Sequence, residues 1–236
     1  MLSALTSLAP HIRKADFDNE AKVFLVKYYP EALQTPMAVP ILDIARKKMG
    51  LRVFERHLSE DFSILGQMCF TNGIAEIYDK KTEEYKEVRV RYGTIIIDPD
   101  TAIKRNEGCK NNTIAHECYH WHKHRDYHIA VSAQRNFKAV RRYYNKEESH
   151  DNIQPGWNDE QIMEWQASNI APRILMPYDM FKRMVEQYVD EYDDIFDIGM
   201  RWHSIHDWVV NNLASFFKVS KKSVVIRLNE TGFAFF

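Results

Sequence analysis

The stretch TIAHECYHWHKHRDYH at 113–128 holds five of the chain's ten histidines, and it limits the possible fold more than any other part of the 236 residues. No proline or glycine occurs within 109–154, so we predict a long helix that begins near Asn112. Residues four apart lie on the same helix face and drift slowly around it. Four of the histidines have this spacing and form one stripe: His116, His120, His124 and His128.

Only one adjacent pair in this stripe has a carboxylate beside it. Glu117 follows His116, so HECYH at 116–120 matches H-E-x-x-H, in which two imidazoles one turn apart bind zinc. The glutamate takes a proton from the water that the metal activates and delivers it to a leaving amine. His124 lies about 12 Å along the axis from His116, too far to bind the same ion, and His122 points away from the stripe. Taken alone, the motif also fits a solvated, histidine-rich helix face.

A catalytic zinc ion takes three protein ligands and keeps one open position. The continuation H-x-x-G-x-x-H, which supplies a third histidine, is absent because Lys123 stands at the glycine position. The downstream segment DEQIMEWQASNIAPRILMP at 159–177 offers Glu160 and Glu164, one helical turn apart. Glu164 is the better candidate, because core-type residues surround it. They are Trp165, Ala167, Ile170, Ala171 and Ile174.

Hydrophobic periodicity predicts the other elements and an α+β fold. Short runs rich in β-branched and aromatic residues within 51–99, separated by turn residues, predict an antiparallel meander of three to five strands. Apolar spacings of three and four predict helices on both sides of this meander and of the histidine helix. These helices are predicted near 17–28, 41–49, 159–176, 178–192, 202–217 and 220–230.

Composition excludes several classes of protein. With 32 basic and 33 acidic residues, the chain has no overall charge that attracts nucleic acid or an anionic membrane. Its three cysteines contain no C-x-x-C pair, which argues against a disulfide framework and favours a reducing compartment. The first residues, MLSALTSLAPHIRK, lack the pattern of a secretory signal, and no window reaches the roughly 18 apolar residues of a membrane span. We therefore expect a soluble, cytoplasmic protein.

Two segments in order carry a resemblance to a known family. NNTIAHECYH at 111–120, followed by EWQASNIAPRILMP at 164–177, resembles the ImmA/IrrE family of small zinc peptidases. VPILDIARKKMGL at 39–51 is similar to the family's entry helix, and GTIIIDP at 93–99 to the strand before its metal helix. LASFFKVSKKSVVIRLNETGF at 213–233 is similar to its C-terminal ending. The resemblance covers most of the chain from about residue 39.

The resemblance implies a zincin-like, gluzincin-type α+β fold, in which a small antiparallel sheet packs on the HExxH helix and on a second ligand helix. It implies one Zn²⁺ per chain, held by His116, His120 and Glu164, with Glu117 as the general base. The best-known members of the family are cytoplasmic proteases that cleave helix-turn-helix repressors of mobile elements or stress responses. We therefore expect a zinc-dependent endopeptidase with anti-repressor activity, whose protein substrate is a DNA-binding repressor.

The chain departs from the family pattern in two places. Ser168 stands where the family often has Asn or Asp, and its hydroxyl is our candidate for orienting a ligand imidazole. The connection between the two motifs is also long, and the extra segment at 133–157 is a candidate substrate lip. The oxyanion donor stays unknown among four residues: Tyr119, His124, His128 and Tyr178. For Tyr119, and for Cys118 beside it, we expect the core side of the helix.

We expect a metallopeptidase domain at 1–195, including an N-terminal helical extension at 1–38, and a helical segment at 196–236 packed on it. This segment has the outline of a helix-turn-helix, with Ser220 as N-cap and Val224, Val225 and Leu228 facing inward. Its second helix is predicted to expose Lys221, Lys222, Arg227 and Asn229.

The alternative function is therefore a DNA-binding regulatory protein with a structural or vestigial zinc site. We expect direct DNA binding less than a packing or docking role. The basic and aromatic residues within 135–146 also fit nucleic-acid binding, but a solvated helix face is favoured because the chain is neutral overall. A metal-free adaptor that keeps the fold is a third possibility.

Overall fold

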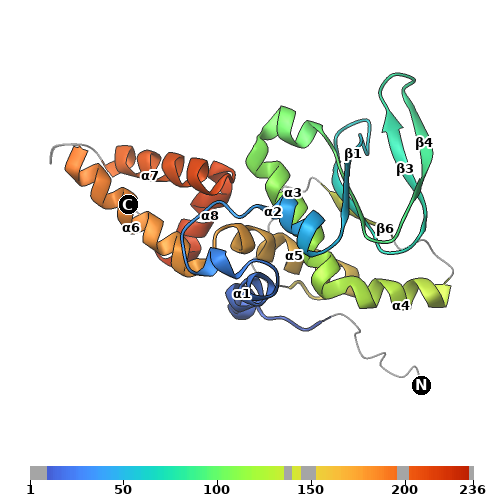
Figure 1. The fold of residues 1–236 in the computed structure, drawn as a ribbon, viewed down its shortest axis with the longest axis horizontal. Helices are drawn as coiled ribbons and strands as arrows, with labels where there is room; N and C mark the ends of the chain where they lie inside the picture. The colour runs from blue at the N-terminus through green and yellow to red at the C-terminus, as the bar shows by residue number, and fades with distance from the viewer. Residues whose placement is uncertain (1–9, 136–139, 145–152, 196–201, 234–236) are drawn as a thin grey trace.

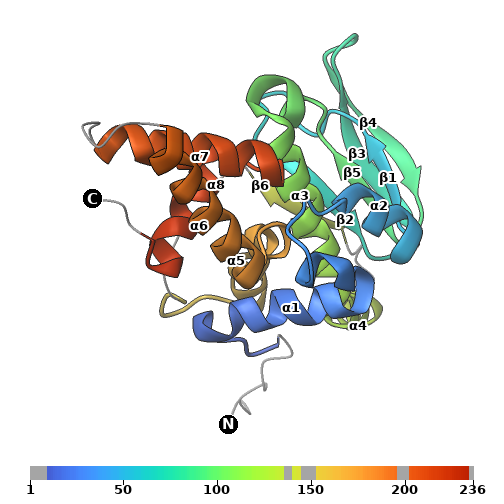
Figure 2. The same cartoon turned by 60° about the vertical axis from the view of Figure 1, so that its left-hand side comes forward.

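The computed structural model describes residues 10–135, 140–144, 153–195 and 202–233. These residues form an α+β fold with α3 and α5 near its centre (Figure 1). The strands lie on one side of these two helices, and α6, α7 and α8 lie on the other. α1 runs along the lower edge and packs against α5 in both views (Figure 2). None of the described helices is long and apolar enough to cross a membrane.

Five strands lie within 51–99, where the sequence predicted three to five, but they form two sheets. The four-stranded sheet has the order β1-β5-β2-β6, and β3 and β4 form a separate antiparallel hairpin. β5 pairs in parallel with β1 and antiparallel with β2. The expected wholly antiparallel meander is therefore wrong, because after the hairpin the chain returns between β1 and β2. The strands are β1 (Arg52–Glu55), β2 (Ile64–Cys69), β3 (Gly73–Asp79), β4 (Glu84–Val90), β5 (Thr94–Ile97) and β6 (Val140–Tyr144).

β6 corrects a second expectation, because its residues were predicted to lie on a helix face. They form a strand paired antiparallel with β2, with Tyr143 opposite Gly66. The sequence VRRYY is rich in β-branched and aromatic residues, and β2 offers a backbone edge to which they bond. Of the extra segment at 133–157, residues 136–139 and 145–152 lie outside the described residues, so its role as a substrate lip stays a prediction.

The histidine stretch forms a long, continuous helical run with a local change of pitch. α3 (Glu107–Tyr119) begins earlier than predicted, because the Asn106 side chain accepts from the backbone N–H of Cys109 and caps it. A π-helical turn follows over His120–His124, and α4 (Arg125–Arg135) continues from it. π-helical turns inside α-helices are frequent at functional sites.

The remaining predicted helices are present, with ends that agree with the sequence to within a few residues. In α1 most residues of the predicted apolar face are buried. Gly232 adopts the left-handed conformation that ends α8. The helices are α1 (Phe17–Tyr28), α2 (Ile41–Asp43) with a π-helical continuation (Ile44–Lys48), α5 (Asp159–Leu175), α6 (Tyr178–Ile195), α7 (Trp202–Phe217) and α8 (Lys221–Thr231). Short turns of helix also occur at Lys14–Asp16, Pro30–Leu33 and Thr101–Arg105.

The surface predicted for the C-terminal helix pair is wrong at Arg227. This side chain is only 2% exposed, and its guanidinium pairs with Asp18 of α1. Val224 and Leu228 are buried as predicted, and the predicted N-cap Ser220 accepts from a backbone N–H of α8. An arginine fits the buried face of α8 because the carboxylate on α1 satisfies its charge there. Lys221, Lys222 and Asn229 are exposed as expected.

Gly108 brings the start of α3 against the turn between α7 and α8. A Cβ at this position would lie 2.5 Å from the backbone nitrogen of Ser220 and still closer to the carbonyl carbon of Val219. Nearby, the Asn111 side chain donates to the backbone carbonyl of Lys218 at 3.0 Å. The C-terminal helices therefore contact the helix that carries the histidine motif.

Replacing Gly108 by Ala tests this contact. We expect Gly108→Ala to lower the free energy of unfolding by about 1–3 kcal/mol, because the backbone of the opposing turn must move. This sign is opposite to that of an ordinary helical Gly→Ala change, which gains about 1 kcal/mol. Chemical denaturation checks it, with Cys109→Ala as the matched control at the next position. An increased stability of Gly108→Ala would show that the two backbones are not in tight contact.

Candidate metal centre

His116, Glu117 and His120 come from the last turn of α3 and the start of the π-helical turn, and Glu164 comes from α5. The two Nε2 atoms of the histidines lie 2.9 Å apart. The Glu164 carboxylate oxygens lie 3.3 Å from Nε2 of His116 and 3.1 Å from Nε2 of His120. The structure thus brings the Glu164 carboxylate to two imidazoles more than forty positions away in the sequence, and the three residues form a group that can hold a metal ion.

The donor set suits zinc in its chemistry and spacing. Two imidazoles and one carboxylate are an established ligand set for a catalytic zinc ion. Ligand atoms about 2.0–2.1 Å from a tetrahedral ion lie roughly 3.3 Å from one another, close to the three distances found here. Both histidines are fully buried, whereas the Glu164 side chain is 24% exposed, so solvent reaches the cluster at Glu164.

Glu164 is held in its charged form. Burial opposes ionisation of this carboxyl group, but the electrostatic influence of the adjacent His120 and His116 imidazoles outweighs burial and holds its pKa well below the usual value. An ionised carboxylate facing two imidazole nitrogens is the state that binds a cation. By contrast, Glu160, one turn earlier on α5, is exposed.

Strand β2 passes directly beside Glu117. A Cβ at Gly66 would lie 2.8 Å from Oε1 of Glu117 and 2.7 Å from Cγ2 of Thr113. Only glycine therefore lets the strand approach α3 this closely, and the fully buried Glu117 carboxylate lies against it. Sequence reasoning missed Gly66. The signal was a glycine inside the apolar strand ILGQMC, where close approach of another group is a common cause.

His124 does not join the ligand set, as its axial distance predicted, but it contacts a member of that set. Its Nδ1 lies 2.9 Å from Nδ1 of His120, and its Nε2 lies 2.9 Å from Oε1 of Gln166 on α5. Gln166 in turn donates through Nε2 to the backbone carbonyl of Pro10 at 2.7 Å. Burial, followed by the electrostatic influence of the adjacent His120 ring, lowers the pKa of His124 well below its ordinary value, so this ring is neutral.

Ser168 is our candidate for orienting a ligand imidazole, and that role stays a prediction. Ser168 is partly buried, and among the described residues no hydrogen bond joins it to either histidine of the cluster. Gln166, two residues earlier on α5, contacts His124 instead. No local sequence pattern indicated Gln166, because its contacts come from the crossing of α5 with the histidine helix and from the N-terminal segment.

The candidate oxyanion donors are directed to other partners. The Tyr119 hydroxyl donates to Glu20 of α1 at 3.3 Å, and both ring nitrogens of His124 are hydrogen bonded. Tyr178 lines a surface pocket between α1 and α6, and His128 stacks on a phenylalanine with ring centroids 4.3 Å apart. Tyr119 is fully buried on the core side, as predicted. The oxyanion donor therefore has no assigned residue.

A second cluster of possible ligands, His57, Asp98 and Asp100, lies near the end of β5. Its charges are already satisfied within the protein. Lys80 and Lys104 pair with Asp100 at 2.7 and 2.8 Å, and the backbone N–H of Asp100 donates to Asp98. This network stabilises the turn after β5, and the two lysine charges disfavour a cation there.

The family model Peptidase_M78, described as the IrrE N-terminal-like domain, matches residues 78–229, well over half of the chain. The chain belongs to this peptidase family. The range matched by the IrrE N-terminal-like domain contains α3 and α5, and so the three residues of the cluster and the adjoining Glu117. The resemblance to the ImmA/IrrE family is confirmed, and membership supports a metallopeptidase function. A search of curated proteins gave no match.

The metal content of purified variants tests the donor set. We expect about one zinc per chain in the wild type and almost none in His116→Ala or Glu164→Ala, because each change removes one of three protein ligands. Glu160→Ala is the matched control on α5 and should keep its zinc. Elemental analysis of protein prepared without chelators measures this directly. Zinc retained in Glu164→Ala but lost in Glu160→Ala would place the third ligand one turn earlier.

Proposed function

We propose that this chain is a zinc-dependent endopeptidase in which His116, His120 and Glu164 bind one Zn²⁺ and Glu117 is the general base. The observation that carries the proposal is the convergence of two imidazoles and a carboxylate on one point, within a chain of a peptidase family. An isolated H-E-x-x-H pattern on a solvated helix face would not be buried, and it would not face a carboxylate from a second helix.

The metal ligands and Glu117 have separate roles in the proposed peptide hydrolysis. A zinc ion bound here supplies a Lewis acid that polarises the scissile carbonyl and makes a water molecule acidic. Glu117 takes the proton of the attacking water and delivers it to the leaving amine. Its contact with Gly66 limits the directions that the carboxylate can take, which favours transfer along one path.

The substrate class that we propose is a helix-turn-helix repressor in the cytoplasm, as the resemblance to the ImmA/IrrE family implies. Cleavage would release the genes that the repressor controls. Membership in the family supports a protein substrate, and the repressor is the finer part of the proposal. Candidate substrates are therefore the helix-turn-helix proteins encoded near this chain.

The alternative function, specific DNA binding through the C-terminal helices, has weaker support. One of its three basic contact residues, Arg227, is buried against α1 and cannot reach a groove. Lys221 and Lys222 at the start of α8 are exposed, but two lysines are few for specific recognition, because phosphate contacts carry no sequence information.

Glu117→Gln separates catalysis from metal binding. We expect cleavage of a helix-turn-helix repressor to fall by about 10²–10⁴-fold, because the amide cannot accept the proton. The zinc content should stay at the wild-type level, since the metal ligands are unchanged. Gel electrophoresis measures the loss of intact substrate, and mass spectrometry identifies the cleaved bond.

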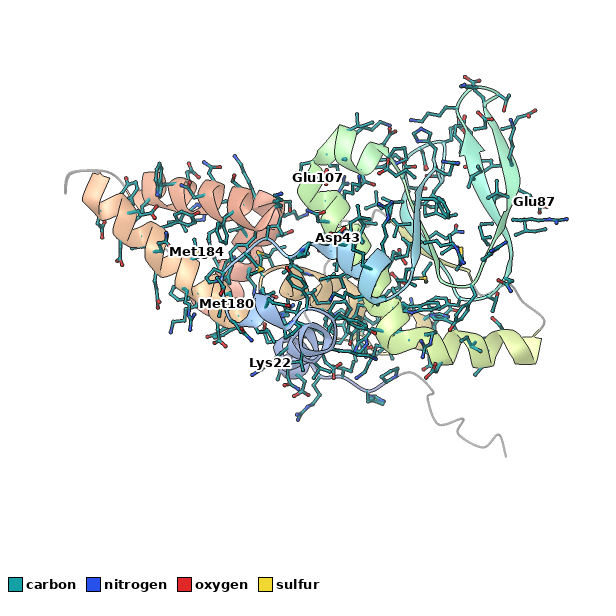
Figure 3. All side chains as sticks on the ribbon, in the orientation of Figure 1. Lys22, Asp43, Glu87, Glu107, Met180 and Met184 are labelled. Atoms are coloured by element: carbon teal, nitrogen blue, oxygen red, sulfur yellow. The ribbon has the colours of Figure 1, made fainter. Side chains whose placement is uncertain are left out.

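The matched control is Glu107→Gln, which changes an exposed glutamate in the first turn of the same helix. Figure 3 shows Glu107 at the N-terminal end of α3, whereas the cluster histidines lie at the other end of this helix. This variant should cleave at the wild-type rate. Cleavage by Glu117→Gln as fast as by the control would overturn the proposed mechanism.

A further inference from the structure

A chain of hydrogen bonds runs from the main chain of Pro10 to the ligand histidine His120. The carbonyl oxygen of Pro10 can only accept, so the group of Gln166 that lies 2.7 Å away must be its NH₂. The other end of the amide, Oε1, then faces Nε2 of His124 at 2.9 Å. An amide oxygen can only accept, so His124 carries its proton on Nε2.

The same logic continues into the metal centre. With its proton on Nε2, His124 has an unprotonated Nδ1, which accepts from Nδ1 of His120 at 2.9 Å. His120 therefore carries its proton on Nδ1, and its Nε2 keeps a lone pair. That Nε2 is the atom that faces His116 and Glu164. One backbone carbonyl thus determines the direction of three successive hydrogen bonds.

We propose that His124 and Gln166 are positioning residues that fix the tautomer and the ring orientation of His120 for metal binding. The proposal rests on the proposed zinc site. Neither residue touches the metal or a substrate, and both act through His120. Groups that hold a ligand imidazole in one tautomer typically strengthen metal binding by 10–100-fold.

Burial makes each of these hydrogen bonds necessary. The side chains of His120, His124 and Gln166 are all fully buried, so water cannot replace a missing partner. If His124 carried its proton on Nδ1, the Gln166 amide would have to reverse so that its NH₂ donates to Nε2 of His124. The amide oxygen would then lie against the carbonyl oxygen of Pro10, and this repulsive contact disfavours the alternative tautomer.

Pro10, whose carbonyl group ends this series of hydrogen bonds, lies outside the residues that the family model matches. That match begins at residue 78, whereas Pro10 precedes α1. The neighbouring Ile12 is buried, which holds this stretch of backbone in place. Glu20 of α1 also pairs with Lys123 at 2.8 Å, so the N-terminal region contacts the histidine helix at a second point. In this chain the N-terminal segment is therefore part of the metal centre.

Two substitutions of His124 separate a hydrogen-bonding role from simple packing. In His124→Asn the amide oxygen takes the place of Nδ1 and still accepts from His120. In His124→Gln the amide instead takes the place of Nε2, and the bond to His120 is lost. We expect His124→Gln to bind zinc about 10–100-fold more weakly than the wild type, and His124→Asn to stay within about threefold of it.

A matched pair at Gln166 tests the next bond. Gln166→Glu keeps an oxygen that accepts from His124 but loses the N–H that donates to Pro10, whereas Gln166→Met has a similar size and no strong acceptor. We expect Gln166→Met to weaken zinc binding about tenfold, and Gln166→Glu to bind zinc more tightly than Gln166→Met but less tightly than the wild type. The control is His122→Asn in the same π-helical turn. The His122 ring contacts Tyr28 of α1 and takes no part in the hydrogen bonds from Pro10 to His120.

The readouts are the zinc dissociation constant, measured by competition with a chromophoric chelator, and the absorption spectrum of the Co²⁺-substituted protein. Circular dichroism of each metal-free variant reports folding. Equal affinities for His124→Asn and His124→Gln, or equal losses for all variants including His122→Asn, would overturn the positioning role. A wild type that binds no zinc would instead overturn the proposed function, so the two failures are distinguishable.

Discussion

The packing of α5 against α3 is the contact on which the rest of the structure depends. It places the Glu164 carboxylate within 3.3 Å of two imidazole nitrogens that are buried in the protein. Removing one member of such a cluster leaves the others desolvated without compensation, which is costly in a low-dielectric interior. The helix crossing therefore has to be held firmly, and the surrounding elements do this from several sides.

The terminal regions of the chain provide much of that support. Asp18 of α1 pairs with Arg227 of α8, and Arg173 of α5 pairs with Glu230 of α8 at 2.8 Å. Buried arginines with carboxylate partners link three helices that are distant in sequence. α1 and α8 thus form one supporting layer beneath α5, while Gly108 brings the same C-terminal region against α3.

The π-helical turn over His120–His124 carries both a candidate metal ligand and a residue that contacts α5. Its first residue faces the ligand cluster and its last faces α5, and a 2.9 Å hydrogen bond joins the two rings. A side chain of the second ligand helix thus reaches the first helix twice, through Glu164 at the cluster and through Gln166 at His124. The two contacts set both the position and the rotation of α5.

The sequence by itself determined the helices, five of the six strands and the candidate ligands, because helical periodicity and the spacing of HECYH are local properties. It also indicated Glu164 over Glu160 from the apolar residues around it. Sheet order, the parallel pairing of β1 with β5, and β6 as a strand depend on where the chain returns in space, and no local pattern encodes that. The burial of Arg227, the closeness of Gly66 to Glu117 and the link from Pro10 to His120 were decided only by the tertiary structure. Each joins residues far apart in the chain whose side chains become complementary only once the helices have packed.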